Sequence, residues 1–184
     1  MKIIITVVAT IAALVILGLA TVLLGISNVS AEHQDKGLVR WVLSTASDRS
    51  VERHAKGIEV PPLGDSAQVA MGFEHYQEMC VTCHGAPGED RSEIGKGLNP
   101  HGPTLARSTT DMSNAEMFWV IKNGIKMTGM PSFGKTHTDE QIWALVSFVK
   151  KLPGMTDEQY RAFEAAYPVK DLMEMEEHDL GHEH

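Results

Sequence analysis

Two cysteines and a histidine within five residues are the most chemically distinctive feature of the sequence. Cys80, Cys83 and His84 have the spacing Cys-x-x-Cys-His, in which two thiols can bond the vinyl groups of a porphyrin and an imidazole can bind its iron. On a helix these residues lie at i, i+3 and i+4 and project from one face. A redox-active thiol pair, a disulfide and half a zinc site are alternatives. The chain has only two cysteines, which excludes a four-thiolate zinc site within one chain, and we favour covalent haem attachment.

The elements that position this motif are expected to be helices, and the predicted fold class is all-α. Asp65 or Ser66 can cap a helix that continues through Cys80 with one apolar side. Capping-box patterns begin at Ser113 and Thr138, and the helices that follow them are expected to end near residues 123 and 152. No stretch of useful length alternates with a period of two, which argues against strands.

Two glycine features of this region need an explanation. Gly72 lies inside the first expected helix, where glycine costs roughly 1 kcal/mol relative to alanine, so it indicates a close packing contact. The stretch from Gly85 to Thr110 is rich in Gly, Pro, Ser and Thr and shows no clear periodicity. Such a long loop is unusual in a compact domain, but a loop can wrap a large apolar cofactor.

The N-terminus is a continuous apolar segment. Residues Ile3 to Ile26 are 24 consecutive uncharged positions. As a helix they would extend roughly 36 Å, enough to cross a hydrocarbon core of about 30 Å. A cleaved signal peptide, with Val29-Ser30-Ala31 as cleavage site, is the alternative, but its apolar region is typically about 7–15 residues. We favour a retained single-pass anchor in the inner (plasma) membrane, with the N-terminus cytoplasmic and the rest of the chain periplasmic.

Four segments of the chain are expected. Residues 1–29 form the anchor, and residues 30–64 a linker with short helices that ends at the Pro61-Pro62 breaker. Trp41 lies in the first of these helices, as a membrane-interface anchor or as part of a small helix packed on the folded domain. A second, polar helix is expected over residues 50–56. Residues 65–154 form the main domain, and residues 155–184 a tail.

The tail carries most of the negative charge. The chain has a net charge of −8, and nine acids against two bases after Gly154 give that part a net charge of −7. A capping-box pattern at Thr156 predicts a short helix that ends before Pro168. A metal site at the tail histidines would be weak, and solvated residues are the favoured interpretation. These histidines are His178, His182 and His184.

Between about Gly72 and Leu152 the sequence resembles the class I c-type cytochromes. Four segments occur in that family's order: the Cys-x-x-Cys-His motif, Gly102-Pro103-Thr104-Leu105, the methionine loop at residues 126–134, and the C-terminal helix at residues 145–149. The resemblance implies three main helices and loops around one covalent haem c. It also implies that Gly72 lies where the first and last helices touch, near Leu145 and Phe148.

The resemblance also implies the ligands of the haem iron. His84 would bind through Nε2 while its Nδ1–H donates to the Pro103 carbonyl, and Pro103 and Leu105 would lie against the haem. Met130 would be the sixth ligand, a thioether that raises the reduction potential relative to a second histidine. Met127 is the rival methionine. Three histidines are less favoured as ligands: His75, His101 and His137.

A His/Met-ligated iron has no open position, so electron transfer is expected and enzymatic activity is not. The expected partners are redox proteins, namely a quinol-oxidising complex and a terminal oxidase or other reductase, together with the membrane and no nucleic acid. A fixed haem subunit of a larger complex, and a peroxidase or ligand sensor with a displaceable methionine, are the alternatives. Three lysines near the methionine loop could steer an acidic partner: Lys122, Lys126 and Lys135.

Overall fold

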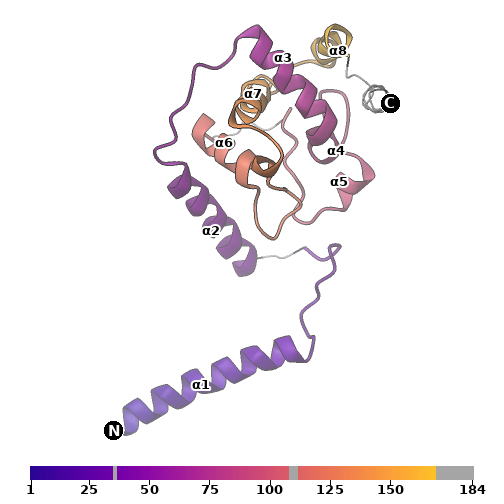
Figure 1. The fold of residues 1–184 in the computed structure, drawn as a ribbon. Helices are drawn as coiled ribbons and strands as arrows, with labels where there is room; N and C mark the ends of the chain where they lie inside the picture. The colour runs from indigo at the N-terminus through magenta and orange to yellow at the C-terminus, as the bar shows by residue number, and fades with distance from the viewer. Residues whose placement is uncertain (35–36, 108–111, 169–184) are drawn as a thin grey trace, which may run out of the picture. The chain divides into compact units, whose positions relative to one another are not determined.

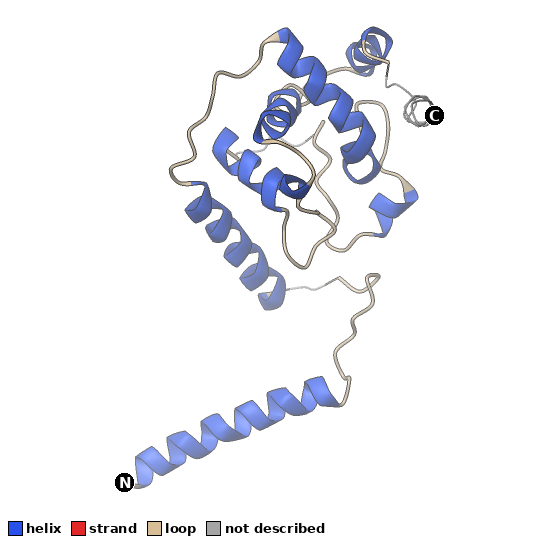
Figure 2. Cartoon of the chain, viewed as in Figure 1, coloured by secondary structure: helices blue, strands red, loops and turns tan. Residues whose placement is uncertain are grey.

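The computed structural model describes residues 1–34, 37–107 and 112–168 (Figure 1). Among these residues the regular elements are all helical, as the sequence predicts (Figure 2). The chain divides into two compact units, Met1–Gln34 and Asp35–His184, which are treated separately below. The tail histidines predicted as a weak metal site lie outside the described residues.

The first unit contains one long apolar helix, α1 (Lys2–Leu23), of 22 residues. Its mean hydropathy is 2.9 and none of its side chains is buried. Its three threonines donate their hydroxyls to backbone carbonyls three or four residues earlier, so they present no unpaired donor to an apolar surrounding. By length and composition α1 can cross a membrane, and a signal sequence near the N-terminus would meet the same criterion.

The core of the second unit is the crossing of α3 (Ser66–His75) and α7 (Asp139–Val149). Phe73 and Phe148 are fully buried there with their rings edge to face, 5.3 Å between centroids. Gly72 lies at the crossing point, where a Cβ would collide with the Ala144 carbonyl and lie 2.9 Å from Phe148 Cβ. The predicted role of Gly72 is therefore confirmed, with Ala144 rather than Leu145 as its nearest neighbour.

Two further helices complete this core. In α6 (Asn114–Asn123), Phe118 stacks on Trp143 of α7 with 4.1 Å between ring centroids. In α8 (Asp157–Ala166), Tyr160 and Phe163 cover the Phe73–Phe148 pair. The predicted capping boxes begin α6, α7 and α8, and all three are confirmed.

The expected linker helices are wrong in one respect. The structure has one continuous helix, α2 (Leu38–Ala55) of 18 residues, instead of two short ones. The polar run between residues 44 and 50 contains neither Gly nor Pro, so nothing in it breaks a helix. Its second half packs on α6, where His54 stacks on Trp119 with 5.4 Å between ring centroids.

The loop after the haem motif also differs from expectation, because it contains the short helix α5 (Glu93–Gly97). Ser92 caps this helix by accepting a hydrogen bond from the Gly95 amide. Gly95 is buried against the Thr82 carbonyl and Cys83 Cα, so α5 packs directly on the backbone of the motif.

We predict that Gly72→Ala destabilises the domain by about 1–3 kcal/mol, because the added methyl group overpacks the crossing of α3 and α7. Chemical unfolding of the haem-loaded protein measures the change in the free energy of unfolding. Gly97→Ala is the matched control, since a Cβ there meets nothing within 4 Å, and it should change stability by less than about 0.5 kcal/mol. Equal stability of the two variants would contradict the assigned contact.

Candidate haem-binding site

The Cys-x-x-Cys-His motif lies at the end of a helix that changes its winding. After α3 comes a π-helical turn, η1 (Tyr76–Cys80), and then a single α-helical turn, α4 (Val81–His84). The buried Tyr76 hydroxyl donates a 2.6 Å hydrogen bond to the Gly85 carbonyl just after the motif. Gly85 ends the helix with a φ of 70°, a backbone conformation that favours glycine. The motif is thus held at both ends.

His84 has the protonation and orientation that an iron ligand needs. Its Nδ1 lies 2.8 Å from the Pro103 carbonyl oxygen. Because a carbonyl can only accept, Nδ1 carries the proton and Nε2 keeps its lone pair for a metal. Burial lowers the pKa of His84 and so favours the neutral imidazole. The hydrogen bond to Pro103 has a smaller effect in the opposite direction. Gly102 lies against the ring, where a Cβ would be 3.2 Å from Cε1.

The two thiols are unbridged and partly buried. Burial, with a smaller contribution from Cys83, raises the pKa of the Cys80 thiol to about 12. A thiol with so high a pKa holds little thiolate at neutral pH, whereas a catalytic redox pair needs a lowered pKa. Cys80 is therefore a buried thiol that is not activated as a nucleophile.

The methionine loop folds back on the end of α6. Gly124 ends that helix with a φ of 67°. The Ile125 amide then donates to the Met130 carbonyl at 3.2 Å, and the Met130 amide donates to Thr128 Oγ1 at 3.1 Å. Met130 packs against the buried core, whereas Met127 is 89% exposed. Of the two candidate ligands, the structure directs only Met130 towards the interior, although ligation itself stays a prediction.

Two rival histidine ligands lie against each other rather than beside His84. The rings of His75 and His137 meet edge to face at 5.2 Å between centroids. His75 Nδ1 lies 3.8 Å from Glu78 Oε2. Burial lowers the pKa of His75, as does the nearby His137, while Glu78 and Glu74 act in the opposite direction. The third rival, His101, lies exposed on the loop before Gly102.

Arg91 is a residue of the site that the sequence does not reveal. Its Nη2 donates to Thr104 Oγ1 at 2.8 Å, which links the start of the α5 region to the Pro103 loop. Its Nε is buried and has no hydrogen-bond partner among the described residues. A buried unpaired donor on a guanidinium suits an acidic group, and the porphyrin of haem carries two carboxylates.

Several apolar side chains of the domain are only partly covered by protein. Leu105 packs against the buried core without being fully covered. Several other apolar side chains near the motif and the methionine loop are in the same half-buried condition, namely Met79, Val81, Met112, Met130 and Phe133. Within the described ranges no group of three or more His, Cys, Asp or Glu could hold a bare metal ion. Haem iron needs only axial ligands, so these residues fit haem better than an isolated metal ion.

Of the three lysines expected to steer an acidic partner, one is paired within the domain. Lys122 forms an ion pair with Asp139 at 2.6 Å and lies over the Phe118 ring, 5.4 Å from its centroid. Its positive charge is therefore paired within the domain. Lys126, the first residue of the methionine loop, and Lys135, just after it, are exposed.

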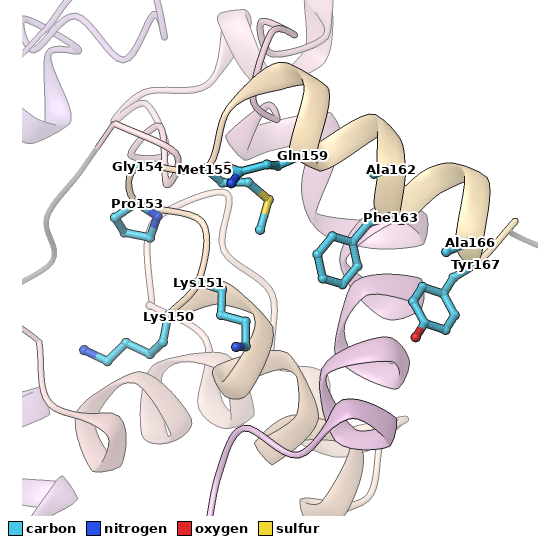
Figure 3. A pocket seen from close by; sticks show the side chains of 10 residues that line it. All are labelled: Lys150, Lys151, Pro153, Gly154, Met155, Gln159, Ala162, Phe163, Ala166 and Tyr167. Atoms are coloured by element: carbon cyan, nitrogen blue, oxygen red, sulfur yellow. The ribbon is translucent and has the colours of Figure 1, made fainter.

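A cavity of about 790 Å³ lies elsewhere, between the end of α7 and α8 (Figure 3). Lys150 and Lys151 border it on one side, and Phe163 and Tyr167 on the other. None of the residues of the haem motif or of the methionine loop lines it. We therefore assign no part of the cofactor site to this cavity.

The helical fold, the attachment motif and the oriented histidine together define a c-type cytochrome domain. Comparison with protein families agrees: residues 67–149 match the family described as Cytochrome C oxidase, cbb3-type, subunit III. Those residues form a class I monohaem cytochrome c domain of this family, preceded by the apolar helix α1. No curated protein matches the chain.

The lowered pKa of His75 makes stability depend on pH. As the pH falls below the ordinary pKa of 6.5, the histidine in the unfolded chain takes up a proton, whereas folded His75 resists protonation. The contribution of His75 to the free energy of unfolding is therefore fully present above that pH and is lost as the pH falls through the lowered pKa. We predict that His75→Gln reduces this loss between about pH 7 and pH 5. Chemical unfolding at each pH measures it, with His33→Gln, outside the domain, as control. An unchanged pH dependence in His75→Gln would contradict the prediction.

Proposed function

We propose that this protein is a membrane-tethered monohaem c-type cytochrome that carries one electron at a time between respiratory complexes. The observation that carries the proposal is the hydrogen bond between His84 Nδ1 and the Pro103 carbonyl, which leaves Nε2 free for iron. A bound haem c supplies a one-electron ferric/ferrous couple. The chain supplies the attachment and the ligands of that group.

Each residue of the site has a distinct part. Cys80 and Cys83 hold the haem through thioether bonds, and His84 binds the iron through Nε2. Met130 is the sixth ligand, supported by its inward packing and by the two hydrogen bonds that shape its loop. Pro103 fixes the histidine ring, and Leu105 covers part of the porphyrin.

With His84 and Met130 both bound, the iron would keep no position for a substrate, and the protein would transfer electrons without catalysing a reaction at the metal. A peroxidase or ligand sensor would require Met130 to leave the iron. The hydrogen bonds within the loop, together with Ser132 Oγ donating to the Lys122 carbonyl at 2.9 Å, oppose such a movement. The thioether also favours ferrous iron, which suits a carrier of relatively high potential.

The membrane attachment is assigned to α1. An uncleaved α1 spans the inner membrane once, with the N-terminus cytoplasmic and the haem domain on the periplasmic side. Support comes from its 22-residue length and mean hydropathy of 2.9. Tethering keeps the domain near membrane partners and raises its effective concentration there. A quinol-oxidising complex is the proposed donor, and a terminal oxidase or other reductase the acceptor.

A second candidate function is supported by the family match. The description of that family names a subunit of a cbb3-type oxidase, so the chain could be a fixed haem subunit of a terminal oxidase. The carrier proposal predicts that mild detergent releases the protein from native membranes as a single haem-containing chain, detected by haem stain after native electrophoresis. Co-migration with the other subunits of an oxidase would favour the fixed subunit instead.

We predict that Met130→Ala abolishes the long-wavelength charge-transfer band of methionine-ligated ferric haem and lets the ferrous form bind carbon monoxide rapidly. The reduction potential should fall by on the order of 0.1 V, within the ~0.8 V range that axial ligands set. Visible spectroscopy measures the band and the binding of carbon monoxide, and redox titration measures the potential. Met127→Ala is the matched control because its side chain is exposed, and it should leave both properties unchanged. Loss of the band in Met127→Ala instead would reassign the ligand.

A further inference from the structure

The first half of α2 exposes a set of large apolar side chains. They are 47–73% accessible, and the set consists of Leu38, Val39, Trp41, Val42 and Leu43. The second half of the same helix is different, since Val51 and Ala55 are each only 6% accessible. The domain therefore covers one end of α2 and leaves the apolar end uncovered.

Rotation of the helix cannot hide these residues. At 100° per residue, Leu38 and Val42 lie roughly opposite Val51 and Ala55, whereas Trp41 is about 40° from Ala55 and is exposed because the domain does not reach that end of α2. The buried side is fixed by the packing of α2 on α6, including the stack of His54 on Trp119. Burying the apolar side against the domain would require exposing the side that now packs.

We propose that this apolar face of α2, residues 38–43, lies in the headgroup region of the membrane that α1 spans. The inference rests on the proposed anchoring by α1. Only residues 24–37 separate α1 from α2, and 14 residues extend at most about 50 Å. The face is consequently held within reach of the bilayer at all times, and an apolar surface gains free energy when it leaves water.

The charge and composition of the face favour lipid over an acidic or basic protein surface. Residues 37–47 contain no acidic side chain, although the chain as a whole has a net charge of −8. Arg40 is the single charged residue of this stretch; it follows Val39 and precedes Trp41 in the sequence, and its long side chain starts from the side of the helix opposite Leu38 and Val42. An indole and a guanidinium beside aliphatic side chains suit the headgroup level, where the rings are half immersed and the cation meets phosphate.

Such docking fixes the orientation of the haem site. Because α2 packs on α6, and α6 leads through Gly124 directly into the methionine loop, a fixed α2 also fixes the direction in which that loop faces. The domain would present a constant side to partners in the plane of the membrane instead of rotating freely on its tether.

The experiment uses the full-length haem-loaded protein in lipid nanodiscs that contain no other protein. Both native cysteines are consumed by the haem, so Val42→Cys and Glu52→Cys each carry a single nitroxide label, and the wild-type chain shows any background labelling. Glu52 is the matched control because it is exposed on the second half of the same helix. We expect the ratio of collisions with dissolved oxygen to collisions with a water-soluble nickel chelate to be several-fold higher at position 42 than at position 52.

Similar ratios at the two positions, both typical of water, would overturn the proposal, because the face would then lie in water although the membrane is present. Leu38→Gln combined with Trp41→Gln should lower the ratio at position 42 towards that at position 52; no change would also count against lipid contact. Alkaline carbonate washing and the haem spectrum are recorded for every sample. A chain that washes off the membrane, or lacks the c-type spectrum, would contradict the proposed function. A retained haem protein with a water-exposed position 42 would contradict only this inference.

Discussion

The close crossing of α3 and α7 at Gly72 is the constraint on which the rest of the domain depends. With no side chain at that position, the backbone of one helix reaches the carbonyl of the other, and the flanking phenylalanines seal the contact. The attachment motif follows α3 along the chain, and the methionine loop precedes α7. One close helix contact therefore holds the two segments that are proposed to contribute iron ligands.

This arrangement also explains why so many apolar side chains near the motif are only half covered. Among the described residues between the motif and α6, the one helix is α5, and it is short. A covalent porphyrin would complete the burial of side chains such as Leu105 and Met130 and so act as part of the hydrophobic core. Cofactor binding and folding are then two aspects of one burial of apolar surface.

Local sequence signals predicted the fold well where they are strong. The Ser113, Thr138 and Thr156 capping boxes mark helix starts because side chain and backbone satisfy each other within four residues. The continuity of α2 is not evident from the sequence because its middle is polar and lacks an apolar periodicity; with neither Gly nor Pro there, the helix continues through it.

The candidate site was predictable only in part. The motif could be recognised from residue types and spacing, and the Pro103 loop from the resemblance to class I c-type cytochromes; the His84–Pro103 hydrogen bond has the expected geometry. Arg91 carries no local signal, because its position beside Thr104 arises from the folding of α5 onto the motif backbone. The commitment of Lys122 to Asp139 likewise depends on two elements far apart in sequence.

The π-helical turn at Tyr76–Cys80 has a consequence for how the haem segment relates to the core. In this turn the Val81 amide bonds to the Tyr76 carbonyl five residues earlier, which accommodates one more residue than an α-turn. Each additional residue shifts the later side chains by roughly 100° around the axis. The turn therefore rotates the side chains that follow it relative to those that precede it. The residues of α3 that pack on α7 and the residues of the attachment motif therefore need not follow one helical periodicity. Substitutions in one set can occur without changing the direction in which the other set points.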